Sequence, residues 1–157
     1  MALQTTGPIS ILDIANEFGG TAPHSMNEYY GVAGGIPTSG IISIGDFYGA
    51  ENVFIFTIST NQQNADIRAL AVNAGWDETA PVECTVNSNV WLWSNNTTLP
   101  GATISGDFPG GLVLYNDGKI IGKGGNGGSG NGGIALAISS SDVSIVNATG
   151  GYIAGRS

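Results

Sequence analysis

The sequence predicts a mainly β protein. A small N-terminal region of short capped helices, residues 1–50, precedes a β-rich sandwich or solenoid-like module with a Gly-rich segment, residues 51–157. In residues 1–50, a motif of Ser, two further residues and an acid, followed by an aromatic side chain, occurs three times. From Val82 onward, short apolar runs are separated by Asn, Gly, Ser and Pro, which is typical of all-β domains. Residues 112–123 also resemble residues 143–156, and repeats spaced by roughly 20–50 residues indicate stacked units.

The repeated motif in residues 1–50 is typical of helix N-termini. Ser is a preferred N-cap, and an acid three residues later completes a capping box, where the helix dipole also favours negative charge. Apolar side chains next to each motif are then placed to pack together. The predicted pairs are Ser10 with Asp13, Ser25 with Glu28, and Ser43 with Asp46, and the apolar residues beside them are Ile9, Phe18, Tyr29 and Phe47.

Two interpretations of this region remain open. Helices of one or two turns are not stable alone, and so short a segment closes a core with difficulty. The region is either a compact helical cap on the rest of the chain or a docking segment that completes its core on another protein. We favour docking, and the Ser, acidic and apolar residues just named are its candidate docking residues.

The module itself is expected to begin with a strand and a helix. The stretch "NVFIFTIST", which starts at Asn52, is apolar on both faces and predicts a buried strand. The stretch "NADIRALAVNAGW" predicts a helix that Asn64 caps and Gly75 ends. Further strands are predicted at residues 82–86, 90–93, 112–115, 119–121, 134–138 and 143–146.

The stretch "GKGGNGGSGNGG", residues 122–133, lies between the two copies of the repeat. It has no side chain that could form a core, and a flexible loop is the favoured interpretation. The alternative is an ordered polyglycine strand whose hydrogen-bond partners are neighbouring glycine strands. A side chain at Gly128 would discriminate between the two.

Composition excludes several functions. The formal net charge is −8 with four Lys and Arg, so there is no basic patch for nucleic acid or for an anionic membrane surface. No apolar run has the ~20 residues of a membrane span, and no secretory signal is recognisable, so we expect assembly in the cytoplasm. With one Cys and one His, Cys–His or Ser–His catalysis and zinc sites lack support. We predict no catalytic, cofactor or metal residues and no enzymatic activity.

One stretch is a candidate for surface binding. In "NVWLWSNNTT", Trp91 and Trp93 share a strand face and are followed by Asn95 and Asn96. Aromatic rings beside amide side chains can hold sugar rings. The competing interpretation, which we favour, is that the Trp face is simply buried in the core.

Several stretches resemble virion proteins of tailed bacteriophages. "ISILDIANEFGG", "SMNEYYG" and "IPTSGIISIGDFYGA" resemble segments near the N-terminus of many phage tail and fibre proteins. "ADIRALAVNAGWDETAPVECTVNSNVWL", "DFPGGLVLYNDGKIIGKGGNGG" and "GGYIAGR" resemble a Gly-rich module common near the ends of fibre and tail-tip proteins. The resemblance covers most of the chain. It implies a non-enzymatic structural or receptor-binding virion component, oligomeric and often trimeric, and it carries over no catalytic residues.

The expected function follows from these observations together. Residues 1–50 would anchor the chain to other virion proteins, and residues 51–157 would form a tail fibre or tail-tip module that contributes to host-surface binding, to a glycan or a protein. Low charge and many apolar residues also favour a homo-oligomer, with a trimer preferred. The alternatives are a head decoration or cement protein that stabilises the capsid, and a carbohydrate-binding module unrelated to phage.

Overall fold

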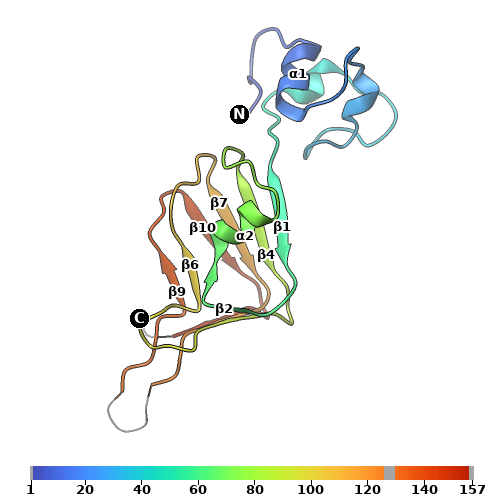
Figure 1. Ribbon diagram of the computed structural model, residues 1–157. Helices are drawn as coiled ribbons and strands as arrows, with labels where there is room; N and C mark the ends of the chain where they lie inside the picture. The colour runs from blue at the N-terminus through green and yellow to red at the C-terminus, as the bar shows by residue number, and fades with distance from the viewer. Residues whose placement is uncertain (1, 126–129, 156–157) are drawn as a thin grey trace. The chain divides into compact units, whose positions relative to one another are not determined.

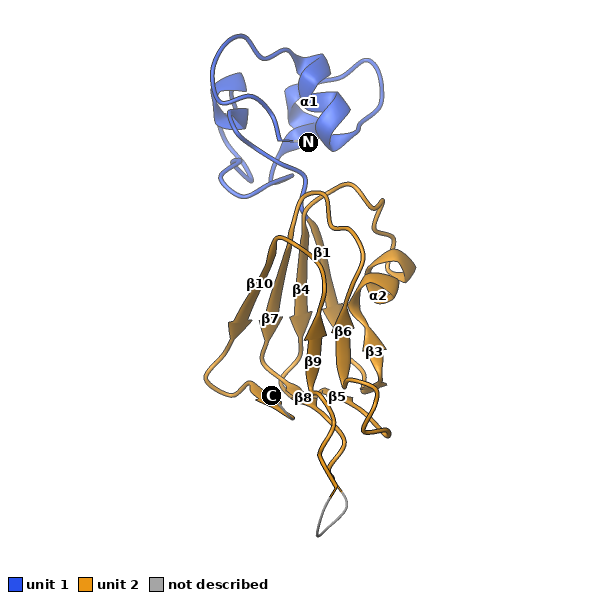
Figure 2. Cartoon of the chain, turned by 90° about the vertical axis from the view of Figure 1, so that its left-hand side faces the viewer, with its two compact units in different colours: residues 1–53 blue, residues 54–157 orange. Residues whose placement is uncertain are grey.

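The structure is a computed structural model that describes residues 2–125 and 130–155. The chain divides into two compact units, residues 1–53 and residues 54–157 (Figure 2). Each unit has its own hydrophobic core.

The first unit is built from three short helices that begin at the three predicted motifs. They are the α-helix α1 (Ile11–Phe18) and two 3-10 helices, η1 (Met26–Tyr29) and η2 (Ile44–Phe47). In α1, the Ser10 hydroxyl accepts the Asp13 N–H at 3.2 Å, while the Asp13 carboxylate accepts the Ser10 N–H at 2.8 Å. The capping boxes that the sequence predicts are therefore present.

The two 3-10 helices use a variant of the same arrangement. The carboxylates of Glu28 and Asp46 accept the backbone N–H of Ser25 and Ser43, at 3.0 and 2.7 Å. The N–H of each acid bonds to the carbonyl of its Ser rather than to the hydroxyl, at 3.1 Å in both copies. The tighter turn brings that carbonyl within reach, because 3-10 helices close their hydrogen bonds over three residues.

Phe47 is the centre of the first unit's core. Its ring is fully buried and makes edge-to-face contacts with Phe18 and Tyr29, each at 6.2 Å between centroids. Ile9 and Ile14 are buried in the same cluster. The short helices thus stabilise each other through shared packing, which supplies what helices of this length lack alone.

The second unit is a parallel β-solenoid (Figure 1). Each turn of the chain adds one strand to each of two or three parallel sheets. The first sheet contains β1 (Phe54–Ile58), β4 (Val82–Val86), β7 (Leu112–Asn116) and β10 (Val143–Asn147), in that order. The second contains β2 (Gln62–Gln63), β5 (Trp91–Trp93), β8 (Lys119–Ile121) and β11 (Tyr152–Ala154), and the third contains β3 (Ala65–Asp66), β6 (Ala102–Ile104) and β9 (Leu136–Ile138).

The register confirms the sequence repeat. Leu112 pairs with Val143 and Lys119 pairs with Tyr152, so the two similar stretches lie side by side in successive turns. The stacking extends backward at similar spacings, because Leu112 also pairs with Val82, and Val82 pairs with Phe54. The predicted fold class is confirmed, with the solenoid as the form that the β-rich module takes.

The core of the solenoid consists of the inward side of each strand. Val82, Cys84 and Val86 alternate with more exposed residues on β4, and Leu112 and Leu114 repeat the pattern on β7. Leu92 and Ile120 are fully buried on the second sheet. Burial raises the pKa of the Cys84 thiol to about 12, so this Cys is an inert core residue.

Two local predictions are wrong. The strand β1 was expected to be buried, yet Ile55 is 67% exposed. It lies on the outward side of the sheet, in register with Glu83, while the alternate residues of β1 pack against the core. The helix α2 (Ile67–Asn73) is capped by Asp66, whose carboxylate accepts the Ala69 N–H at 3.1 Å, and not by Asn64. Asn64 instead lies at the corner before β3, where its N–H bonds to the Trp93 carbonyl in the next turn.

Candidate functional site

No group of three His, Cys, Asp or Glu side chains within residues 2–125 and 130–155 could hold a metal ion. Asp77, which follows α2, accepts the N–H groups of Thr79 and Ala80, and these bonds lower the pKa of its carboxyl. It therefore stabilises a turn.

The outer side of the sheet β2–β5–β8–β11 carries exposed aromatic side chains. Trp91 is 44% exposed and Trp93 is 38% exposed, whereas Leu92 between them is fully buried. The interpretation that the two Trp side chains are core residues is thus wrong. The two Trp side chains lie on the solvent side of β5. Leu92 is the residue of β5 that faces the core, where it pairs in register with Ile120.

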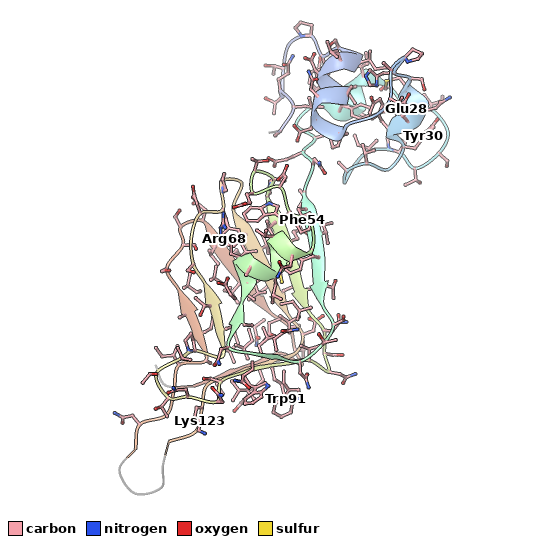
Figure 3. The ribbon with its side chains drawn as sticks, viewed as in Figure 1. Glu28, Tyr30, Phe54, Arg68, Trp91 and Lys123 are labelled. Carbon is pink, nitrogen blue, oxygen red and sulfur yellow. The ribbon has the colours of Figure 1, made fainter. Side chains whose placement is uncertain are left out.

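The register places other side chains in line with the two Trp residues. Trp91 pairs with Lys119, and Lys119 pairs with Tyr152, which is 55% exposed. In the next row, Trp93 lies between Gln63 and Ile121. We call these outward side chains the aromatic face; its members are Gln63, Trp91, Trp93, Lys119, Ile121 and Tyr152. Figure 3 shows Trp91 extending outward from this sheet.

Lys119 is held against the aromatic face. Its Nζ lies 5.0 Å from the centroid of the Trp91 ring, within the range of a cation–π contact. Among the described residues, no carboxylate forms an ion pair with Lys119, and the four strands of the sheet contain no Asp or Glu. A single cation thus stands among aromatic rings on a protein with a net charge of −8.

The two candidate amides after β5 lie at a corner of the solenoid. Asn95 accepts the side-chain N–H of Asn64 from the preceding turn at 3.4 Å. Asn96 accepts both the N–H and the hydroxyl of Thr98, at 2.9 and 3.0 Å. Both side chains therefore bond within the protein, whereas Lys119 and Tyr152 share the sheet with the Trp residues.

Sequence reasoning missed Lys119 and Tyr152. The repeat aligned them with each other, but nothing in the sequence showed that Trp91 belongs to the same row. That alignment requires the length of the turn between β5 and β8, which only the folded chain reveals.

The candidate docking residues of the first unit occupy two kinds of position. Ile9, Tyr29 and Phe47 are buried in the unit's own core, and the Ser and acidic residues bond to each other at the helix starts. The large apolar side chains that are exposed on this unit are not among the predicted docking residues. They are Leu12, Ile41, Ile44 and Tyr48, of which Ile41 is 91% exposed.

Local hydrogen bonds set the charge state of the helix starts. The bonds from Ser10 lower the pKa of the Asp13 carboxyl, and the backbone N–H of Ser25 lowers that of Glu28. Tyr29 donates its hydroxyl to the Gly19 carbonyl and lies 3.2 Å from Nδ1 of His24. Burial raises the pKa of Tyr29, which packs in the core of the first unit.

The Gly-rich stretch projects between β8 and β9 as two closely spaced segments, residues 122–125 and 130–133, which we call the glycine arms (Figure 1). The Gly133 N–H donates to the Lys123 carbonyl at 2.6 Å. A Cβ at Gly122 would collide with the Gly133 carbonyl, and one at Gly125 with that of Gly130. The arms approach backbone to backbone within one chain, which only glycine permits. Gly128 lies outside the described residues.

No helix in the described part of the chain is long and apolar enough to cross a membrane. A comparison with curated proteins and with solved structures finds no match. A family model described as phage tail fibre adhesin Gp38 matches residues 53–155, which is the whole described solenoid. By this match over most of its length, the chain belongs to the Gp38 family of phage tail fibre adhesins.

Proposed function

We propose that this chain is a non-enzymatic adhesin of the phage tail fibre, displayed on the virion, whose solenoid contacts the host surface. The observation that carries the proposal is the family match. It begins at residue 53, where the first unit ends, and covers the solenoid. The family is one of adhesins rather than of enzymes. The solenoid offers what adhesion needs, namely a rigid stack of strands with exposed aromatic side chains, which are enriched where proteins bind partners.

The first unit is then the attachment to other virion proteins. Residues 1–52 lie outside the matched region. Because the first unit has a complete core of its own, a partner would bind its outer surface. Ile41, Ile44 and Tyr48 supply exposed apolar area within a short stretch of sequence. Large apolar side chains on the outside of a small unit are typical of protein interfaces.

The test uses the full chain and a truncation that lacks residues 1–50. We expect the full chain to be detected at the tail of the intact phage by labelling, and the purified truncation to bind host cells and reduce phage adsorption. The truncation should remain folded, because the solenoid has a separate core. Label on the head shell, or a folded truncation that neither binds cells nor competes, would contradict the adhesin proposal. Normal incorporation of the truncation into particles would contradict attachment through the first unit.

A further inference from the structure

We propose that the aromatic face binds an acidic glycan, with pyranose rings stacked on the Trp and Tyr side chains and a carboxylate or phosphate of the sugar paired with Lys119. This inference rests on the proposed adhesin function and names the ligand class and the surface. Three properties of the face carry it: the geometry of the rings, the placement of charge, and the use of amide groups.

The exposed aromatic residues lie in register on neighbouring strands of one sheet. Trp91 and Tyr152 lie in one row of a parallel sheet, separated by Lys119, and strands in a sheet are about 4.7–4.9 Å apart. Trp93 lies two residues along the same strand as Trp91, on the same side. The aromatic residues are thus attached at regular backbone intervals, along β5 and across the sheet, on an exposed surface. Sugar rings present apolar C–H faces, and an extended saccharide can place successive rings on such a surface.

The charge of the face differs from that of the whole chain. The protein carries 12 acidic residues and four Lys and Arg, yet none of the acids lies in the four strands of this sheet. Lys119 is in the centre of the row, and Lys123 follows β8 at the start of the glycine arms (Figure 3). Lys119 has no ion-pair partner among the described residues and pairs in register with Trp91 and Tyr152. Such a cation favours an anionic group over a neutral one.

The polar groups at the edge of the face divide into bonded and unbonded ones. Asn61 already accepts the Trp91 N–H at 2.8 Å, so it fixes the strand rather than a ligand. Gln63 is exposed and pairs in register with Trp93. Its amide can donate to and accept from sugar hydroxyls beside the ring. Stacking, an ion pair and an amide together suit an acidic saccharide better than an apolar peptide.

The experiment measures binding of the full chain to arrayed glycans that carry uronic acid, sialic acid or phosphate, each beside its neutral counterpart. We expect binding to acidic glycans and weaker binding to the matched neutral ones. Trp91→Ala and Lys119→Gln should each weaken that binding by about tenfold or more, as for residues at the centre of an interface. In the Lys119→Gln variant, the difference in affinity between acidic glycans and their neutral counterparts should also be smaller than in the parent chain. Ile138→Ala, which removes an exposed apolar side chain from β9 in another sheet of the solenoid, is the matched control and should bind like the parent chain.

Three results would overturn the inference: no glycan binding, equal binding of acidic and neutral counterparts, or unchanged binding of Trp91→Ala and Lys119→Gln. Circular dichroism of each variant excludes loss of fold as the cause of weaker binding. The cell-binding assay separates this inference from the proposed function. If the variants still bind host cells and compete with the phage, the adhesin role stands and the aromatic face is not its glycan site.

Discussion

The side-chain amide of Asn116 donates to the side-chain oxygen of Asn147 at 2.7 Å, one turn further along the solenoid. The two residues pair in register at the ends of β7 and β10, and the Asn147 amide in turn donates to the Gly151 carbonyl at 2.9 Å. Asn116 is fully buried. This corner therefore joins two turns by polar contacts inside an otherwise apolar stack, where loss of a hydrogen-bond partner is costly.

We expect Asn116→Ala to destabilise the solenoid by about 1–3 kcal/mol, because it leaves the Asn147 oxygen without its donor and opens a small cavity. The midpoint of thermal unfolding should fall by several degrees. Asn73→Ala is the control: Asn73 ends α2 on the surface and should change stability little. Equal melting of both variants and the parent would show that the corner bond contributes nothing.

The glycine arms predict a contrast between two neighbouring glycines. A Cβ at Gly122 collides with the carbonyl of Gly133, whereas one at Gly124 has no atom within 4 Å. Gly122→Val should therefore lower the thermal midpoint by several degrees or prevent folding, and Gly124→Val should melt like the parent. If Gly122→Val also melts like the parent, the arms do not require their close approach.

The helix starts of the first unit predict sensitivity to acid. The folded-state pKa values of Asp13 and Glu28 lie below their ordinary values of 3.8 and 4.5. Their contribution to stability is therefore present above those values and is lost as the pH falls through the lower, folded-state pKa values. Amide hydrogen exchange should show that the N–H groups of Ser10 and Ser25 lose protection in this acid range. Asp13→Asn should lose the acid-dependent part at Ser10 and leave that at Ser25. A pH-independent protection of both groups would contradict the prediction.

Self-association is a further expectation. The edge strand β1 leaves Ile55 exposed, and Phe56 and Leu70 line a shallow groove between β1 and α2. An unpaired apolar edge is a site for pairing with another chain. We expect light scattering at micromolar concentration to find a homo-oligomer, with a trimer favoured, and Ile55→Lys to weaken it without unfolding the chain. A stable monomer for the parent chain at that concentration would contradict this expectation.

Much of the fold was predictable because it depends on local sequence. The capping boxes join residues three apart, so Ser10 and Asp13 specify a helix start wherever the chain lies. The strands β4 and β8 lie at the predicted residues because apolar runs and turn residues bound them closely. The repeat of residues 112–123 indicated stacking, since similar sequences in successive turns form similar strands.

The rest was decided by tertiary structure. Alternation along β5 showed that Trp91 and Trp93 share a face, but only the closure of the turns shows that Leu92, and not the Trp pair, faces the core. The path of the chain from turn to turn also places the Lys119 ammonium over the Trp91 ring and Tyr152 in register with Lys119. Exposure of Ile55 likewise depends on which side of β1 faces the core. The sequence alone determined which segments become helices and strands. The tertiary structure decided which side of each strand meets solvent and which residues are neighbours across turns. Both depend on the number of residues in each turn of the solenoid, because that number sets the register of successive strands.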